Sequence, residues 1–232
     1  MFISSATLPH WLKVSILADI IFAVMILYNL LYAQTFQINL AILSESLAAT
    51  AGFLLGFSFA LSGMSYFFNF LDSKLHYRKQ LGLVGYYFAL VYSLTLVFRF
   101  PEKYGNGLTS HILDGEVLLG FGAMAILTMM AIISHPQAVH ILGATFWRIL
   151  LRMGYIAFIL LIIRAVMIEG EIWQVWFSTM ETVPPPRLVL TVFAIAVIVL
   201  RIILQIAITF FPKKKIASAV INSNTVVPTT LS

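Results

Sequence analysis

The chain has 232 residues, of which 61% are hydrophobic and only 10% are charged, and its mean hydropathy is +0.98. A soluble domain of this length needs more polar surface than that composition provides, so the sequence indicates an integral membrane protein. Cysteine is absent, which excludes disulfides, iron–sulfur clusters and thiolate ligation of haem.

Six apolar stretches, each about as long as a bilayer is thick, make up most of the sequence. A helix needs roughly 20 apolar residues to cross the hydrocarbon, and outside a β-barrel only helices satisfy the backbone there. Barrel strands alternate polar and apolar residues, and these stretches do not. We therefore predict an all-α bundle of six transmembrane helices at residues 12–33, 40–61, 80–98, 112–134, 147–168 and 188–211.

Polar residues and prolines mark the helix boundaries. The second stretch continues as an aromatic segment over residues 63–71, so its helix is expected to extend into the membrane interface before Asp72. Pro136 follows the fourth stretch, and prolines 184–186 precede the sixth, as expected at helix ends. Residues 1–211 form the predicted helical domain, and the polar residues 212–232 are expected to be a disordered cytoplasmic tail.

The distribution of Lys and Arg predicts the orientation, because short loops rich in cations stay in the cytoplasm. One set of helix ends holds nine cations and the other holds three, and most of the acids lie on the cation-poor side. Both termini are therefore expected to be cytoplasmic, in a plasma membrane or a bacterial inner membrane. Because these cations are spread over several helix ends, we expect them to set the orientation in the membrane and to contact anionic lipid. The same spread argues against nucleic acid as a partner. The nine are Lys13, Lys74, Arg78, Lys79, Arg148, Arg152, Lys213, Lys214 and Lys215.

Two segments carry a resemblance to a known family. Residues 78–94 read RKQLGLVGYYFALVYSL, a basic start that runs directly into the third predicted span. This segment resembles the third helix of the ferric reductase-like transmembrane family, and its opening is especially similar to six-transmembrane metalloreductases of the STEAP type. The start of the fifth span looks like the family's fifth helix, through Leu142-Gly143, Trp147-Arg148, Leu150-Leu151-Arg152 and Tyr155.

The resemblance implies transmembrane electron transfer through b-type haem, from a cytoplasmic flavin to ferric ion, oxygen or another acceptor. In that family the haem is held between histidines of the third and fifth helices. Here Tyr92 stands at the third-helix position, and Leu151 and Arg164 stand at the fifth-helix positions. A standard bis-histidine haem is therefore not expected, because every histidine lies outside the middle of a predicted span: His10, His76, His111, His135 and His140.

Histidines at the span ends leave two other sites open. His76, His135 and His140 lie on one side of the membrane and could together bind haem or a metal, although contact with headgroups and water is the commoner role. His111 beside Asp114 could hold a metal at the outer end of the fourth span, or belong to a wet acidic loop.

Tyr92 and Arg164 are the candidate cofactor-binding residues inside the bundle. A phenolate can ligate haem iron, and a neighbouring guanidinium favours the charged phenolate. The sequence therefore leaves two roles open for Tyr92, that of a haem ligand supported by Arg164 and that of an ordinary hydrogen-bonded packing residue.

Four charged residues lie inside predicted spans, where charges are costly and usually paired. At 1.5 Å per residue, Asp19 and Arg201 fall on the inner half of the membrane, and Glu45 and Arg164 on the outer half. We therefore predict two intramembrane pairs, Asp19 with Arg201 and Glu45 with Arg164, each facing the bundle interior.

Two functions remain open at this point. In the first, the haem is lost and the protein is a haem-depleted or accessory subunit of a membrane complex. In the second, it is a b-type haem electron carrier with non-standard ligands, fed by a separate cytoplasmic flavoprotein or by quinol. Arg78 and Lys79 would then contact phosphate or carboxylate groups of the donor cofactor. Either way, the expected partners are the lipid bilayer and a flavoprotein or another subunit of a membrane complex.

Overall fold

The computed structural model describes residues 10–35, 37–68, 74, 76–105, 108–134, 138, 143–180 and 183–210. The regular structure in these parts of the chain is helical, and six helices are long and apolar enough to cross a membrane, which confirms the predicted fold class. The six are α1 (His10–Tyr32), α2 (Leu40–Phe67), α3 (Tyr77–Arg99), α5 (Gly115–Ile133), α7 (Ala144–Thr179) and α8 (Pro186–Phe210). Between α3 and α5 lie the π-helical turn η2 (Pro101–Gly105) and the one-turn helix α4 (Leu108–His111).

Two helices run past the ends of their apolar stretches. α2 continues to Phe67, as its aromatic extension predicts. α7 continues to Thr179, well beyond the predicted end at residue 168. Glu169 ends the apolar run but not the helix, because Glu is a good helix former and this carboxylate has a partner in Arg187 of α8. The predicted tail at 212–232 lies outside the described residues.

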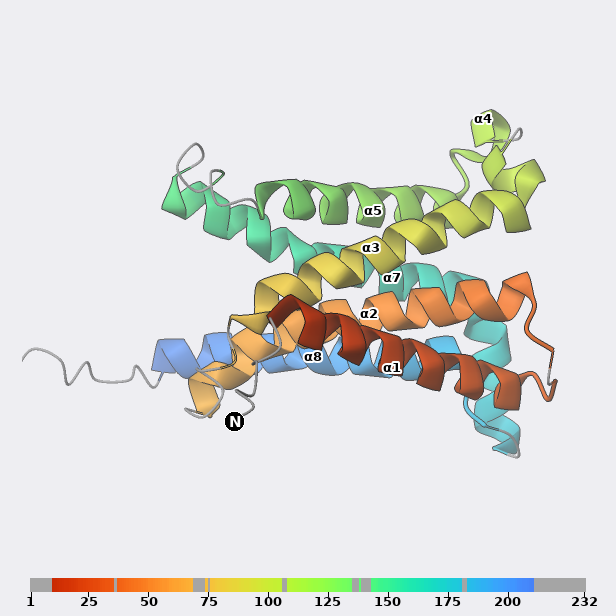
Figure 1. Cartoon of the computed structure of the whole chain (residues 1–232), viewed down its shortest axis with the longest axis horizontal. Helices are drawn as coiled ribbons and strands as arrows, with labels where there is room; N and C mark the ends of the chain where they lie inside the picture. The colour runs from red at the N-terminus through yellow and green to blue at the C-terminus, as the bar shows by residue number, and fades with distance from the viewer. Residues whose placement is uncertain are drawn as a thin grey trace, which may run out of the picture.

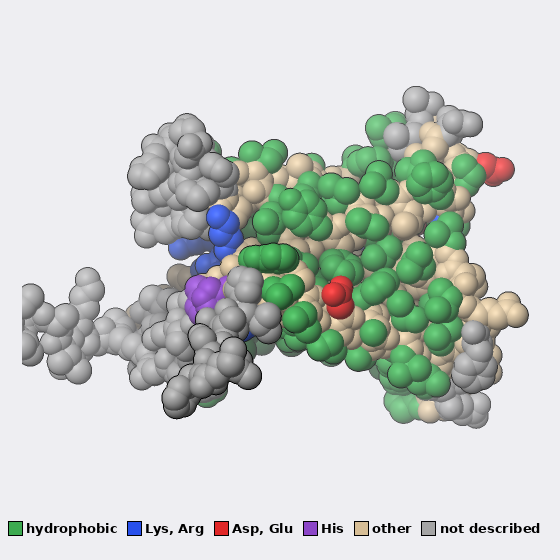
Figure 2. All heavy atoms as spheres, viewed as in Figure 1, with side chains coloured by type: hydrophobic (Ala, Val, Ile, Leu, Met, Phe, Trp, Pro, Cys, Tyr) green, Lys and Arg blue, Asp and Glu red, His purple; other side chains and the backbone are tan. Residues whose placement is uncertain are grey.

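The six long helices alternate in direction along the chain (Figure 1). We call the end where α1, α3 and α7 begin the basic end, because it holds Arg78, Lys79 and Arg152. The opposite end is the acidic end, because it holds Glu116 and Glu169. Figure 2 shows hydrophobic side chains across the middle of one face, with Lys and Arg gathered mainly at the basic end. This distribution is that of a multi-pass membrane protein.

The central helix of the bundle is α2, which packs against α1, α3 and α8 and has 56% of its most apolar segment buried. α5 packs mainly against α7, and Figure 1 shows α5 on one side of the bundle, apart from α1 and α8. Phe59 of α2 reaches α7, where its ring centroid lies 5.0 Å from that of Tyr155 and 5.3 Å from that of Phe158. Gly154 permits this contact, because a Cβ there would lie 2.3 Å from the Phe59 ring.

Replacing Gly154 with Ala is expected to destabilise the bundle by about 1–3 kcal/mol, because the added methyl group displaces the Phe59 ring from the core. Unfolding of the purified protein in detergent, followed by tryptophan fluorescence, measures the change. Gly170→Ala on the same helix is the matched control, because its Cβ would meet Val166 at an ordinary 3.8 Å. Equal stability of the two variants would contradict the close contact between α2 and α7.

Candidate functional site

An ion-pair network at the acidic end joins four helices. The Glu45 carboxylate of α2 lies 3.2 Å from the Arg99 guanidinium at the end of α3 and 4.0 Å from that of Arg187 at the start of α8. Arg187 also lies 2.9 Å from Glu169 of α7. Arg99 donates a further hydrogen bond of 2.8 Å to the Ser44 hydroxyl. These contacts neutralise the charges and fix the rotation of α2, α3, α7 and α8 relative to one another.

In the structure, Glu45 pairs with Arg99 and Arg187. Residue depth predicts Arg164 as its partner, and that pair is not formed. Depth along a helix does not determine the direction of a side chain. Arg99 ends α3 directly beside the start of α2, because these two helices are antiparallel neighbours. Arg164 instead points from α7 toward α3 and α5. The count of cations at the helix ends assigns Arg99 and Arg187 to loops. For this reason neither of them is expected from the sequence as a partner for Glu45.

The predicted pair of Asp19 with Arg201 is not formed either. The guanidinium carbon of Arg201 lies 5.5 Å from the centre of the Tyr155 ring, in a cation–π contact. Asp19 is exposed on the surface of α1, and among the described residues it has no ion-pair partner. α1 buries Val14 and Ala18, and the next residue is rotated by about 100° around the helix, which carries Asp19 off the buried face.

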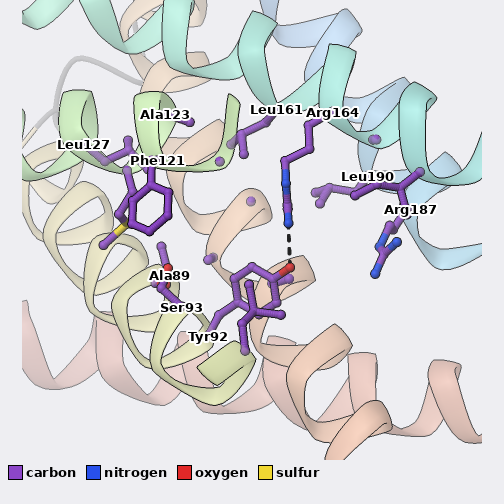
Figure 3. A pocket seen from close by; sticks show the side chains of 18 of the residues that line it. Ala89, Tyr92, Ser93, Phe121, Ala123, Leu127, Leu161, Arg164, Arg187 and Leu190 are labelled. Carbon is purple, nitrogen blue, oxygen red and sulfur yellow. Dashed lines mark hydrogen bonds between the residues drawn. The ribbon is translucent and has the colours of Figure 1, made fainter. Parts of the chain in front are cut away.

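A cavity of about 380 Å³ lies between α3 and α7 and is bordered by α2, α5 and α8. Figure 3 shows Arg164, Tyr92 and Arg187 pointing into its acidic-end part, while Phe121 and Leu127 line a part further from them. We call this the Arg164 cavity. Most of its wall is apolar, and its buried apolar lining includes Ala51, Leu55, Ala89, Val117, Ala123, Leu127, Phe158 and Ala194.

Arg164 crosses the acidic-end part of this cavity. Its Nε donates a hydrogen bond of 2.9 Å to the backbone oxygen of Glu116, and its two terminal nitrogens donate to the hydroxyls of Tyr104 at 3.2 Å and Tyr92 at 3.5 Å. All three acceptors are neutral, because they are a peptide oxygen and two hydroxyls. The Glu116 carboxylate instead pairs with Lys103. In the described parts of the chain, no carboxylate lies within ion-pair distance of Arg164. The structure thus brings Tyr92 and Arg164 together.

A second cavity, of about 230 Å³, lies toward the basic end and is lined by Arg78 and Lys79. Ser58 of α2 fixes the first turn of α3 there, by donating a hydrogen bond of 2.8 Å to the backbone oxygen of Arg78. Leu55 and Leu127 line both cavities, so the two lie next to each other along the bundle. The four predicted cofactor-binding residues therefore divide into two pairs, one pair in each cavity.

Among the residues that the structure describes, no histidine lines either cavity. His10 and His76 lie together at the basic end with ring centroids 4.4 Å apart, and His111 lies 2.9 Å from Asp114 at the acidic end. The other two histidines are outside the described residues. Across the part of the chain that the structure describes, no group of three His, Cys, Asp or Glu residues could hold a metal ion. The described lining of the two cavities therefore supplies no imidazole, and the expectation that a bis-histidine haem is absent stays a prediction.

Comparison with known proteins gives this chain no family. No family model matches the sequence, and no curated protein matches it. The resemblance to the ferric reductase-like family, carried by residues 78–94 and 142–155, stays a prediction. The function is therefore argued from the geometry of the site.

Replacing Glu45 with Gln is expected to destabilise the protein by about 1–3 kcal/mol, because Arg99 then loses its carboxylate partner inside the membrane. Thermal unfolding in detergent, followed by tryptophan fluorescence, measures the loss. Glu171→Gln, an exposed acid on α7, is the control and is expected to change stability by less than about 0.5 kcal/mol. A Glu45→Gln protein as stable as this control would show that the ion-pair network does not hold the helices.

Proposed function

We propose that the protein is a haem-free accessory subunit of a membrane complex, built on a six-helix bundle of the ferric reductase-like type. The observation that carries the proposal is the carboxylate of Asp19, which is exposed midway along a membrane-spanning helix. The residues between α3 and α7 support the haem-free part of the proposal, and the surroundings of Asp19 support the accessory role.

Asp19 lies deep in the membrane-spanning part of α1. Counted from His10, the first residue of the helix, it is roughly 14 Å along the axis, about half of a hydrocarbon layer of ~30 Å. An aspartate at the centre of a transmembrane helix costs roughly 2.5–3.5 kcal/mol on insertion, and charged residues in spans almost always face the bundle interior or pair with one another. A carboxylate that faces outward at this depth therefore favours contact with another membrane protein.

The surroundings of Asp19 indicate the chemistry of that partner. Ile16, Ile20 and Leu27 are exposed on the same side of α1, so the face is apolar apart from the carboxylate. Ala23, one turn beyond Asp19, is also exposed, and its small side chain lets a second helix approach closely. The partner is therefore a transmembrane helix with Lys, Arg or a hydrogen-bond donor at the matching depth.

The Arg164 cavity supports the haem-free part of the proposal. The resemblance implies a haem between the third and fifth spans, and in this chain that region contains the Tyr92 hydroxyl and the Arg164 guanidinium. A guanidinium has no lone pair to offer to iron, so Arg164 cannot replace a histidine ligand. The hydroxyls of Tyr92 and Tyr104 are left as oxygen donors, and both already accept hydrogen bonds from Arg164.

Protein expressed with added haem precursor and purified in detergent is expected to show no Soret band, before or after reduction with dithionite. The physical reason is that the described interior offers no pair of imidazoles to hold the iron. A band that shifts on reduction would contradict the proposal and favour the second function, a b-type haem electron carrier with non-standard ligands. The Tyr92→Phe variant would then show whether the phenolate is a ligand, because only in that case does the substitution alter the spectrum.

A photoreactive amino acid placed at Ala23 is expected to cross-link to one other membrane protein when native membranes are irradiated. The Asp19→Leu substitution in the same chain is expected to abolish the product, because the partner loses the carboxylate that it neutralises. Mass spectrometry of the cross-linked peptide identifies the partner span, which should carry a cation or a hydrogen-bond donor.

The same photoreactive group at Val199 is the matched control, because this residue is also exposed midway along a membrane-spanning helix but lies on α8. It is expected to give no protein product. Cross-links from position 23 to lipid alone, or to a second copy of this chain, would contradict the accessory role. A product that persists in the Asp19→Leu protein would show that the carboxylate does not select the partner.

A further inference from the structure

The described residues around Arg164 do not neutralise its charge. A guanidinium has five N–H donors, and the three that have acceptors among the described residues donate to a backbone oxygen and two hydroxyls. Gly120 makes room for this side chain, because a Cβ there would lie 3.2 Å from Arg164 Nε. The bundle therefore holds a cation in place inside the membrane, where a charge without a partner of opposite sign is costly.

The neighbouring charges limit a ligand of this cavity to a single negative charge. Arg187 already lies 2.9 Å from Glu169 and 4.0 Å from Glu45, and Lys103 pairs with Glu116. In the described part of the chain, only the charge of Arg164 remains to be balanced at this end of the cavity. A group with two negative charges would also be repelled by the carboxylates of the ion-pair network.

The rest of the cavity is mostly apolar and small. Away from Arg164 its wall is formed mostly by hydrocarbon and aromatic side chains, among them Phe121, Leu127 and Phe158. The hydroxyls of Ser93 and Thr191 also line it, and that of Ser93 donates a hydrogen bond to the backbone of its own helix. Its volume of about 380 Å³ is near the lower end of the roughly 300–1,000 Å³ typical of small-molecule sites. This size suits one hydrocarbon chain better than the two chains of a phospholipid.

From this combination we infer that the Arg164 cavity is a binding site for a long-chain carboxylate, a fatty acid or a molecule with the same two parts. The carboxylate accepts hydrogen bonds from Arg164 and from the hydroxyls of Tyr92 and Tyr104, and the hydrocarbon chain packs against the apolar wall. The site is separate from the proposed partner surface, because no residue of α1 lines this cavity. Failure of one proposal therefore leaves the other standing.

Binding of radiolabelled palmitate to the full chain in detergent tests the inference. The wild-type protein is expected to bind one palmitate and to gain thermal stability as the palmitate concentration rises. Arg164→Gln is expected to weaken binding at least about tenfold, because it removes the charge-assisted hydrogen bonds. Arg164→Lys, which keeps the charge, is expected to fall between the two. Every variant is measured in the same detergent, so palmitate dissolved in micelles contributes the same background to each binding measurement.

Arg201→Gln is the matched control, because it removes a guanidinium from another part of the bundle that does not line the cavity. It is expected to bind palmitate as the wild-type protein does. Ala89→Leu tests the apolar part, because it adds volume at a buried lining residue and keeps the charge. It is expected to reduce binding while the elution volume on gel filtration stays the same, and it decides the question even where Arg164→Gln does not fold.

Two further ligands distinguish the chemistry of the headgroup. Hexadecanol has the same chain length without the charge and is expected to bind at least about tenfold more weakly than palmitate. Hexadecyl phosphate is expected to bind more weakly than palmitate at a pH where it carries two charges. Equal binding of palmitate by the wild-type and Arg164→Gln proteins, equal binding of hexadecanol, or tighter binding of the phosphate would each overturn the inference.

Discussion

Charges inside a bilayer are costly unless they are paired, and at the acidic end of this bundle such pairs tie the helices together. Glu45 on the central helix α2 reaches Arg99 of α3 and Arg187 of α8, and Arg187 reaches Glu169 of α7. Apolar packing between transmembrane helices is only weakly directional, because lipid tails are as apolar as the side chains. The ion pairs therefore determine which faces of four helices turn inward, and so where the Arg164 cavity lies.

The cavity exists because α3 and α7 border the same space and are joined across it by polar contacts. Figure 3 shows the Arg164 side chain reaching from α7 to the Tyr92 hydroxyl of α3. Toward the basic end, the Phe59 ring of α2 lies tilted against Tyr155 and edge-to-face with Phe158. That part of the interior thus contains aromatic rings beside the second cavity, and the acidic-end part contains a cation hydrogen-bonded to hydroxyls.

Much of the fold could be predicted from the sequence, because span length and apolar composition are strong signals in membrane proteins. The contact between Tyr92 and Arg164 also agrees with the sequence-based hypothesis that a guanidinium lies beside this phenol. The partner of Glu45 could not be predicted, because depth along a helix carries no information about rotation. The missing ion-pair partner of Asp19 among the described residues has the same cause. Asp19 is rotated by about 100° from the buried Ala18, and its depth in the membrane does not reveal this rotation.

The length of α7 links the cavity to the surrounding lipid. Its 36 residues span about 54 Å at 1.5 Å per residue, against a hydrocarbon thickness of ~30 Å, so the helix tilts or projects past the headgroups. The apolar run ends before Glu169, and the same continuous helix carries Arg164 inside the bundle. Arg164 moves with α7, whereas the hydroxyls of Tyr92 and Tyr104 belong to α3 and η2. A change in the tilt of α7 would therefore change the separation between the guanidinium and the hydroxyls, so a force on the projecting end of this helix would reach the polar part of the cavity.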